Sequence, residues 1–560
     1  MELHSDMTIN GQGKKLRGSC PLKVIERLPN NVYVADCKQN GIHLAGLTTR
    51  GFHRPFAFGH TELFCDGESY RLSRYPKEQY LTIQGYGESH DVSKDDVQDV
   101  GKLDKGFFYA DAVPSTWKHT NNLYLFGYWA YDWACTYEQI DQMDPEKGFL
   151  LTAAPFGMHY FRKGQRFCFV NVLDALSPGE YALDLEEEKI YFMPREEDDL
   201  KRLTASHTLN GLLLENLENV VIEGYDIGEY LGYGILVRNC RNITIRNCRI
   251  HHVGGNAVRV ENSWNVLIEN CEICYTGEGG IHFESGDREA LLHGDSGARN
   301  CHIHDVAEWA VVYAPGIYLG GCGLFAEKNC IHDAPHTAIL YEGNDMRIVE
   351  NVIYDVLYQT DDAGAIYAGR NPTFRGNVIS GNLLFRTGGY KSYTSGIYND
   401  DVLSGTTITN NVFYNINNAI LCGGGRDMLI RSNTFINCKP AIRIDNRGVS
   451  QTEQWRGCME QIRTMFRNVF DDPTKAERFL SAYPELQKWQ DYFASEELPF
   501  IRAEGVIAEN IYCGSFVEVS DWCDTAHEYS IFDNLQQKET DVIEKIPQHY
   551  RDVLAAENEL

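Results

Sequence analysis

Three stretches decide the fold: "NVVIEGYDI" at 219–227, "NITIRNCRI" at 242–250 and "NVLIENCEI" at 265–273. They are spaced by 23 residues, and in each one apolar and polar positions alternate until Asn or Gly breaks the run. The unit returns five more times, at 327–334, 346–356, 375–385, 406–416 and 428–438. Repetition at such a period indicates a solenoid, in which every repeat stacks on its neighbours.

The repeats predict an all-β fold, a right-handed parallel β-helix. Each unit holds two or three short runs rich in Ile and Val, which leaves no room for a helical crossover between parallel strands. Alternate residues would point into a stacked core, and Asn or Gly would occupy the tight turns. A leucine-rich repeat is disfavoured because its leucine spacing is missing, and a propeller because its units are longer.

The extent of the repeat divides the 560 residues into four expected regions. Residues 1–207 are β-rich and aromatic but lack the 23-residue period, so we expect a separate, sandwich-like β region. Residues 208–449 are expected to form the β-helix with its groove, and residues 450–500 a helical insertion. Residues 501–560 are expected to add a final coil, beginning with "EGVIAENIYCG", and a C-terminal tail.

The helical insertion carries start signals for two helices. Ser450 and Glu453 have the spacing of a capping box, and Asp472 followed by Pro473 is typical of an N-cap with proline in the first turn. The first helix is expected to bury one face. That face comprises Trp455, Met459, Ile462, Phe466 and Phe470.

The charge balance limits the partners. The chain has 51 basic and 79 acidic residues, a formal charge of −28, which repels nucleic acid and anionic membrane surfaces and favours neutral substrates. No segment reads as a signal peptide and no apolar run has membrane-spanning length, so we expect a cytoplasmic protein. Assembly into a homo-oligomer is left open.

Seventeen scattered cysteines predict reduced, buried thiols rather than a disulfide framework. Cys271 and Cys274 form a C-x-x-C, but no second pair stands at zinc-finger spacing. Histidines recur in "IHH" (250–252), "HIHD" (302–305) and "IHD" (331–333) without a recurring set of acidic ligands. Stacked or turn-capping histidines are therefore favoured, and we predict no metal and no cofactor.

Two successive coils are longer than the others. The Asn that closes each turn recurs after 22 residues from 329 to 351, then after 31 to 382, after 29 to 411 and after 22 to 433. The extra residues include the acids of "QTDDAGAIYAGR" (359–370) and "TSGIYNDDVLSG" (394–405). Insertions in a solenoid emerge as loops on one face, which places the candidate site there.

Aligning five coils on their shared motif separates the core from the acids. The inward positions form one isoleucine stack, made of Ile339, Ile366, Ile397, Ile420 and Ile442. An outward column three residues further on alternates acids with glycines: Glu342, Gly369, Asp400, Gly423 and Asp445. Glycine between the acids relieves like-charge repulsion and opens a groove.

Acids that approach one groove from two sides suit glycoside hydrolysis. One carboxyl donates a proton to the leaving oxygen, and the other acts as nucleophile or activates water. We predict that Asp362 pairs with Asp401, with Asp400 in reserve, provided that residues 359–363 fold back over the groove. Glu342 is the substitute if Asp362 lies too far away, and adjacent coils favour a retaining mechanism.

Neighbouring side chains are predicted to hold the sugar. Arg370 can hold a carboxylate or a hydroxyl, and Tyr367, Tyr398 and Trp309 can offer aromatic faces. Further polar candidates for substrate binding are His336, Asn344, Asp345, Asn399 and Asp445.

Several motifs closely resemble glycoside hydrolase family 141. They are "GGIHFESGDRE" (279–289), "HDAPHTAILYEGNDM" (332–346), "DDAGAIYAGRNPTFRGNVI" (361–379), "SGIYNDDVLSGTTITNNVFYN" (395–415) and "GGGRDMLIRSNTFINCKPAIRID" (423–445). Stretches of the N-terminal region, such as "TELFCDGESYRLSRYP" and "GEYALDLEEEKIYFMP", are similar to the leading β region of that group. The resemblance therefore extends over most of the chain.

This resemblance implies an enzyme acting on plant or host glycans, with α-L-fucosidase and xylanase among the family activities. It implies an acid pair in which Asp362 matches the aspartate of "DAG" and Asp400 or Asp401 matches the other member. Asn399 is a departure, since an apolar residue is expected before the two acids, and it is predicted to alter the subsite. A β-xylosidase of a neighbouring family is a further alternative, and exo-action on short neutral oligosaccharides is expected.

Two other classes compete with a glycosidase. A polysaccharide lyase or epimerase would use Arg370 or Lys391 as base, but the acidic groove would repel a uronate substrate unless calcium intervened. A non-catalytic, tailspike-like β-helix would bind a glycan without cleaving it.

Overall fold

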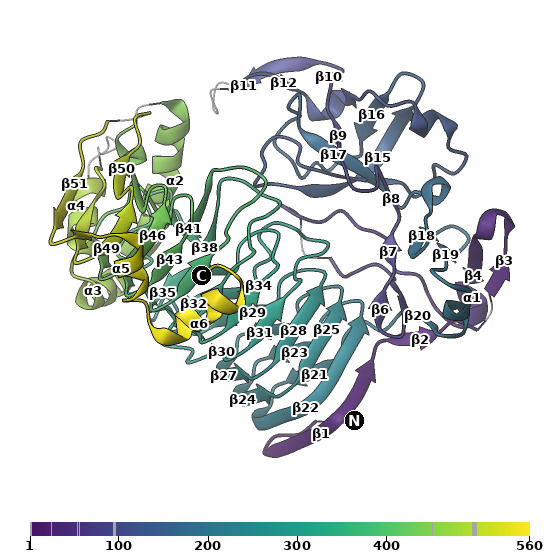
Figure 1. Ribbon diagram of the computed structural model, residues 1–560, viewed down its shortest axis with the longest axis horizontal. Helices are drawn as coiled ribbons and strands as arrows, with labels where there is room; N and C mark the ends of the chain where they lie inside the picture. Colours follow the sequence, from purple (N-terminus) through teal and green to yellow (C-terminus); the bar gives the residue numbers. More distant parts are fainter. Residues whose placement is uncertain are drawn as a thin grey trace.

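The computed structural model describes residues 3–23, 25–52, 54, 57–92, 97–450, 452–494, 501–522 and 524–560. Its centre is a parallel β-helix, as the repeats predict, and Figure 1 shows the coils stacked side by side beneath the N-terminal β region. Helices α2 (Glu453–Phe470), α3 (Pro473–Ala482) and α4 (Leu486–Phe493) lie at the far end of the stack.

Each full coil contributes one strand to an 11-stranded sheet and two strands to a 22-stranded sheet. The 11-stranded sheet carries the candidate site. It comprises β21 (Leu212–Glu215), β23 (Ile235–Arg238), β26 (Val258–Glu261), β29 (Ile281–Ser285), β32 (Ile317–Cys322), β35 (Ile339–Asn344), β38 (Ala363–Gly369), β41 (Thr394–Asp400), β44 (Ile420–Gly423), β47 (Ile442–Asp445) and β50 (Val517–Val519).

The 22-stranded sheet closes the other two sides of the solenoid. It comprises β1 (Met7–Arg17), β22 (Glu218–Tyr230), β24 (Arg241–Arg246), β25 (Arg249–Val253), β27 (Trp264–Glu269), β28 (Glu272–Thr276), β30 (Gly297–Arg299), β31 (His302–His304), β33 (Phe325–Glu327), β34 (Cys330–His332), β36 (Arg347–Val349), β37 (Val352–Ile353), β39 (Val378–Ser380), β40 (Leu383–Phe385), β42 (Thr407–Thr409), β43 (Val412–Tyr414), β45 (Met428–Arg431), β46 (Thr434–Cys438), β48 (Glu504–Ala508), β49 (Ile511–Gly514), β51 (Glu528–Phe532) and β52 (Leu535–Gln536).

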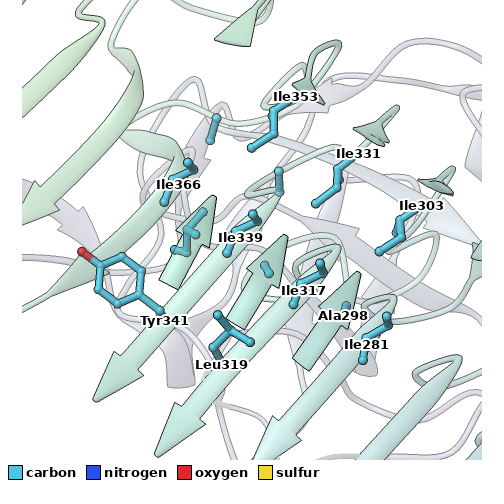
Figure 2. Close-up of a cluster of buried hydrophobic side chains, with 14 of the residues drawn as sticks. Ile281, Ala298, Ile303, Ile317, Leu319, Ile331, Ile339, Tyr341, Ile353 and Ile366 are labelled. Atoms are coloured by element: carbon cyan, nitrogen blue, oxygen red, sulfur yellow. The ribbon is translucent and has the colours of Figure 1, made fainter. Parts of the chain in front are cut away.

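Strand register confirms the alignment of the repeats. Ile366 pairs with Ile339 on one side and with Ile397 on the other, and the stack continues through Ile420 to Ile442. Figure 2 shows part of this core, in which the isoleucines of successive coils point the same way. Fully burying one such side chain contributes about 1.5–3 kcal/mol relative to leaving it exposed, so the stack fixes the register.

The turn asparagines form a buried ladder. The Nδ2 of Asn329 donates to Asn351 Oδ1 at 3.0 Å, Asn351 donates to Asn382 at 2.9 Å, and Asn382 donates to Asn411 at 2.9 Å. The ladder runs on from Asn411 through Asn433 to Asn510. Each amide satisfies its neighbour, so the corner of the solenoid stays dry without an unpaired polar group.

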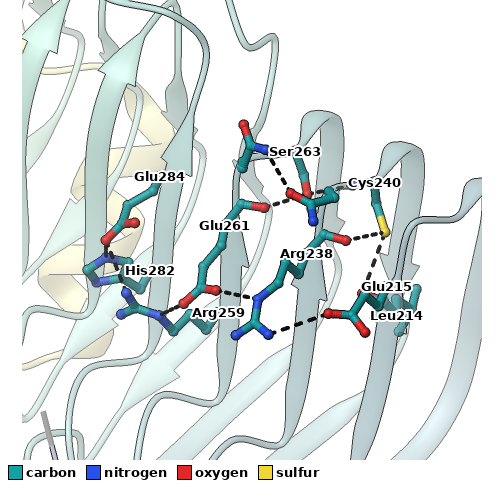
Figure 3. Close-up of polar contacts among 11 residues, drawn as sticks. Leu214, Glu215, Arg238, Cys240, Arg259, Glu261, Ser263, His282 and Glu284 are labelled. Carbon is teal, nitrogen blue, oxygen red and sulfur yellow. Dashed lines mark hydrogen bonds and ion pairs between the residues drawn. The ribbon is translucent and has the colours of Figure 1, made fainter.

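Charged side chains form a second ladder on the outer face of the 11-stranded sheet. Arg238 Nε lies 2.8 Å from Glu261 Oε2, and Arg259 bonds Glu261 at 2.6 Å and Glu284 at 3.1 Å (Figure 3). His282 completes the run 2.9 Å from Glu284 Oε1. Partly exposed pairs contribute about 0–1 kcal/mol each, and here they leave the acids of the early coils paired.

The N-terminal region is less separate than the sequence indicates. Strand β1 pairs in parallel with β22 and so covers the first coil, although "MTINGQGKKLR" contains no complete repeat unit from which a period could be read. The remaining strands form antiparallel-rich sheets packed beside the solenoid (Figure 1). They are β2 (Ser19–Pro21), β3 (Ile25–Arg27), β4 (Tyr33–Asp36), β5 (Leu63–Cys65), β6 (Glu68–Ser69), β7 (Arg71–Leu72), β8 (Arg74–Tyr75), β9 (Leu81–Thr82), β10 (Gly85–Tyr86), β11 (Ser89–Val92), β12 (Val97–Gly101), β13 (Phe107–Phe108), β14 (Tyr124–Gly127), β15 (Thr136–Asp144), β16 (Phe149–Thr152), β17 (Arg166–Val170), β18 (Glu180–Asp184), β19 (Lys189–Met193) and β20 (Leu203–Ser206).

The helices begin near the predicted signals. Asp472 caps α3 as predicted, accepting bonds from the N–H groups of Thr474 and Lys475. The cap of α2 is Thr452 rather than Ser450, because the Thr452 side chain is the one that accepts from Trp455 N. Met459, Ile462 and Phe466 are buried as predicted, while Phe470 and Trp455 are only partly buried.

The chain after the helices completes the solenoid with one coil, β48 to β50, and part of another, β51 and β52. Helices α5 (Glu539–Ile543) and α6 (Gln548–Ala556) then pack on Leu383, Phe385 and Tyr414. The described cysteines are free thiols. Within the described part of the chain, no helix combines the length and hydropathy that crossing a bilayer requires.

Candidate active site

A cavity of about 830 Å³ lies on the outer face of the 11-stranded sheet. Its walls come from three parts of the chain. The solenoid supplies Tyr313, Leu340, Glu342, Asp362, Tyr367, Gly369, Arg370, Tyr393, Tyr398, Asp400, Asp401, Asp445 and Arg447. The N-terminal region supplies Phe52, Tyr131, Trp133 and His159, and the segments beyond residue 450 supply Gln454, Trp455, Gly457, Cys458, Gln461 and Trp522.

Strand alternation places the central side chains in this cavity. Ile366 and Ile397 point into the core, so Tyr367 and Tyr398, one residue further along, point out. Gly369 pairs with Asp400 in the predicted outward column, and Gly423 pairs with Asp445. A Cβ on Gly369 would lie 3.2 Å from Asp400 Cβ, so glycine here leaves space beside the carboxylate.

Asp362 reaches the same cavity from the position directly before β38. The N–H of Asp362 donates to Tyr393 O at 2.8 Å, and the Tyr398 hydroxyl donates to Asp362 Oδ1 at 3.2 Å. Gly364 permits this approach, since a Cβ there would lie 2.6 Å from Tyr398 Cβ. Asp362 thus lines the same cavity as Asp400 and Asp401 while its segment stays in parallel register with the next coil, so the fold-back of residues 359–363 is not what brings it there.

The N-terminal region holds this segment in place. The Arg166 guanidinium donates to Gln359 O and lies 3.7 Å from the ring centroids of both Tyr128 and Tyr390. Lys391 Nζ lies 2.5 Å from Asp132 Oδ2, and the N–H of Asp361 donates to Asp132 O at 3.4 Å. The position of Asp362 thus depends on contacts with Asp132 and Arg166, which precede it by about 200 residues in the sequence.

Arg447 organises the opposite side of the cavity. Its Nη1 donates to Asp400 Oδ1 at 2.5 Å and to Asp401 Oδ1 at 2.9 Å, and its Nη2 donates to Asp445 Oδ2 at 3.0 Å. Arg370 Nε donates to Asp401 Oδ2 at 2.8 Å. One guanidinium therefore collects three carboxylates, and a second binds the remaining oxygen of Asp401.

Burial, and then the nearby charge of Asp400, raise the pKa of Asp362 to about 7. Arg447 and the hydrogen bond from Tyr398 act in the opposite direction and lower it. Burial, and then the adjacent Asp401, also raise the pKa of Asp400, whereas Arg447 and the hydroxyl of Tyr367, 2.8 Å from Asp400 Oδ2, oppose the rise. Arg447 forms an ion pair with Asp400. Among the described residues, no cation is bound in this way to the carboxyl group of Asp362, which accepts a hydrogen bond from Tyr398. Burial therefore raises the pKa of carboxyl groups on both sides of the cavity, and the bound cation Arg447 lies on the Asp400 side.

Most of the predicted site residues line the cavity. These are Asp362, Asp400, Asp401, Glu342, Arg370, Tyr367, Tyr398 and Asp445. Glu342 lies apart from the Arg447 cluster and accepts a bond from the Tyr318 hydroxyl at 2.6 Å.

Asn399 does not line the cavity, because it lies on the inward side of β41. It follows Ile397 by two residues and so shares its direction, and its Oδ1 accepts a bond from the Tyr341 hydroxyl at 3.3 Å inside the core. The predicted change of a substrate subsite at Asn399 is therefore wrong, because strand alternation places this side chain in the core.

Four other predicted residues lie elsewhere. His336 is buried behind Tyr313, whose N–H donates to His336 Nδ1 at 3.4 Å. Trp309 packs beneath the N-terminal region, with Nε1 3.4 Å from Glu62 Oε1.

Asn344 is the last residue of β35, and Asp345 lies in the bend that follows it. Asn344 donates to Thr373 O at 2.8 Å, and Asp345 accepts from Tyr483 at 2.9 Å. Both side chains are bonded to neighbouring chain segments and do not line the cavity.

Sequence reasoning missed Arg447 and most of the aromatic wall. Arg447 stands two residues after Asp445, and the outward alternation of that coil was a usable signal. Trp455, assigned to a buried helix face, instead stacks on Trp522 with ring centroids 5.5 Å apart. Trp133 stacks on Tyr131 at 5.1 Å on the opposite wall, where packing between distant regions leaves no local signature.

Comparison with known proteins agrees with the fold. A family model described as "Right handed beta helix region" matches residues 210–301 and 289–454. A solved structure described as "Glycoside hydrolase" aligns with a TM-score of 0.56 at 12% identity, covering 79% of this chain and 84% of that chain. These findings identify the solenoid as a right-handed β-helix.

Other solved structures are similar at lower scores. One is described as "The complex structure of XylC with xylose", with a TM-score of 0.40 at 10% identity, covering 94% of this chain and 76% of that chain. Another is the A-module of the mannuronan C-5 epimerase AlgE6 of Azotobacter vinelandii, with a TM-score of 0.36 at 11% identity, covering 59% and 80%. No curated protein sequence matches the chain.

Proposed function

We propose that the chain is a glycoside hydrolase that cleaves terminal residues from neutral, plant- or host-derived oligosaccharides. The observation that carries this proposal is the division of carboxyl groups across one cavity: Asp362, with its pKa raised to about 7, stands opposite Asp400 and Asp401, which share Arg447. Glycosidic cleavage needs one protonated and one ionised carboxyl group on either side of the bond.

In this mechanism Asp362 is the general acid that protonates the departing oxygen. We place the second role at Asp400 rather than at Asp401, because both oxygens of Asp401 are bound by guanidinium groups. Asp400 also acts on the pKa of Asp362 more strongly than Asp401 does, which indicates that it is the nearer charge. Asp401 and Arg447 are then positioning residues for Asp400.

The walls support a short, neutral substrate. Trp133 with Tyr131 on one side and Trp455 with Trp522 on the other offer aromatic faces for sugar rings. Exo-action is part of this proposal, and a second cavity of about 390 Å³, bordered by Asp132 and Lys391, adjoins Asp362. The specific expectation is an α-L-fucosidase or xylanase activity of the family 141 type, or a β-xylosidase activity of a neighbouring family.

A uronate-specific lyase or epimerase fits the side chains less well. Both bases considered for it are engaged, Lys391 by Asp132 and Arg370 by Asp401. The cavity also presents Glu342, Asp362, Asp400, Asp401 and Asp445 against the cations Arg370 and Arg447, an acidic excess that disfavours a carboxylated sugar.

Incubation with aryl glycosides, α-L-fucoside and β-D-xyloside first, followed by natural oligosaccharides, tests the proposal. A hydrolase releases reducing sugar, and Asp362→Asn abolishes that release. Ultraviolet absorbance from an unsaturated product would instead indicate a lyase, and binding without either signal would indicate a non-catalytic module. Early products from a long polymer decide the mode of action, because a ladder of mid-length fragments contradicts exo-action.

A further inference from the structure

Histidine and cysteine side chains gather on the outer surface of the 22-stranded sheet, on a different sheet from the cavity. His302 of β31 pairs with Cys330 of β34, and His304 pairs with His332 one step further along the same two strands. Ile303 and Ile331 between them point into the core, so the four polar side chains face out together. The arrangement is a square of ligand-type residues across two adjacent coils.

Three of these side chains converge on one point. The Nε2 atoms of His302 and His332 are 2.7 Å apart, and one ring nitrogen of each histidine lies within 4.8 Å of the Cys330 Sγ. Tetrahedral zinc takes nitrogen ligands at about 2.0–2.1 Å and thiolate at about 2.3 Å, which puts neighbouring nitrogens roughly 3.3 Å apart. Opening the two rings by about half an ångström would admit the ion.

The surrounding side chains fix the ligating atoms. The Nδ1 of His332 lies 2.6 Å from Asp333 Oδ2, so its N–H is directed to the carboxylate and the lone pair of Nε2 is left for a metal. The His332 ring is stacked between His304 and Tyr354, with centroid distances of 5.1 Å and 4.7 Å. A carboxylate behind a ligating histidine is the usual second layer of a zinc site.

A simple hydrogen bond between His302 and His332 explains less. It accounts for the 2.7 Å contact but not for the thiol of Cys330 beside the two nitrogens. His304 belongs to the neighbouring group, with its Nε2 3.7 Å from Glu272 Oε1. Asp305 and Asp333 lie against the histidine rings, at 2.7 Å and 2.6 Å, and favour a dication at this place.

We propose that His302, Cys330 and His332 bind one divalent transition-metal ion, for which Zn²⁺ has the matching ligand chemistry. His302 is exposed, which leaves the fourth position to water. The ion ties strand β31 to strand β34 and so stabilises the stacking of two adjacent coils. This revises the expectation that these histidines only stack or cap turns.

The test uses the full chain, freed of metal with a chelator and titrated with Zn²⁺ by calorimetry and with Co²⁺ by absorbance. We expect binding of one equivalent, a thiolate-to-cobalt charge-transfer band, and a higher Tm with metal present. His302→Gln and Cys330→Ser should each remove this binding, while Asp333→Asn should weaken it about 10- to 100-fold. Because His302 is exposed, its variant is expected to keep the fold, which circular dichroism checks.

Cys274→Ser is the matched control, since Cys274 belongs to a neighbouring group with Glu272 and His304. Stoichiometric binding that survives Cys274→Ser and is lost in Cys330→Ser supports the assignment. Absence of stoichiometric binding to the full chain, or binding that depends on Cys274 and not on Cys330, overturns it.

Discussion

The Tyr398 hydroxyl lies 3.2 Å from Oδ1 of Asp362, although the two residues belong to different coils and approach the cavity from opposite ends of their strands. The same hydroxyl lies 3.4 Å from Arg447 Nη2. A single tyrosine therefore stands between the carboxyl with the raised pKa and the guanidinium that collects the other acids. Catalytic activity is expected to depend on this bridge.

Asp362→Asn is expected to lower kcat/KM by at least about 10³-fold, because an amide can no longer donate a proton to the leaving oxygen. Substrates with a good leaving group, such as a dinitrophenyl glycoside, should lose less, since they need little protonation. Comparing the two leaving groups on the same sugar measures this. Equal losses on both would contradict the role of general acid.

The activity is expected to fall as the pH rises above about 7. Burial raises the pKa of Asp362 to about 7, so the carboxyl is protonated below that pH and loses its proton above it. The alkaline limb of the kcat/KM profile should therefore have its midpoint near pH 7. A profile that stays flat from pH 6 to pH 9 would remove Asp362 from this role.

The same carboxyl is expected to lower stability at alkaline pH. Its folded-state pKa lies above the unfolded value of 3.8, so the folded chain binds more protons between about pH 4 and 7 and loses stability as the pH rises through that window. Asp362→Asn escapes this loss. Its Tm should exceed that of the wild type at pH 8, and the difference should shrink at pH 4.

Asp400→Asn and Asp401→Asn are expected to lower kcat for different reasons and by different amounts. Asp400→Asn should lower kcat by about 10³-fold or more, whereas Asp401→Asn should act through misplacement of Arg447 and Asp400 and cost less. Azide rescue separates the two roles, because a small anion can replace a missing nucleophile but not a missing positioning group. Rescue of Asp401→Asn alone would reverse the assignment.

Gly364→Ala is expected to disturb the site without touching substrate. The added Cβ would lie 2.6 Å from Tyr398 Cβ, so the backbone just after Asp362 must shift. We expect kcat to fall about tenfold or more, since small displacements of catalytic groups are costly. Gly85→Ala is the control, because a Cβ there meets nothing within 4 Å, and its kinetics should match the wild type.

Features of the fold and site that repeat locally along the chain were predictable from the sequence, whereas contacts between regions distant in sequence were not. The isoleucine stack and the asparagine steps repeat along the chain, so the β-helix and its register were predictable from alternation alone, and Gly369 and Asp400 pair as expected. Asn399 was misplaced although the same alternation puts it in the core. Trp133 lines the cavity and Arg166 bonds Gln359 from another region of the chain, and no local pattern encodes which surfaces will meet.

The asparagine ladder has a consequence for how this protein can change. Asn433 bonds directly to Asn510 across the helical segment, and the bond is as short as those between uninterrupted coils, 3.1 Å against 3.0 Å. The solenoid therefore closes on itself whatever is inserted between residues 450 and 500. One wall of the cavity is therefore carried by an exchangeable helical segment, and replacing helices α2 to α4 with a different segment is expected to change what the pocket binds while the coils beneath keep their register.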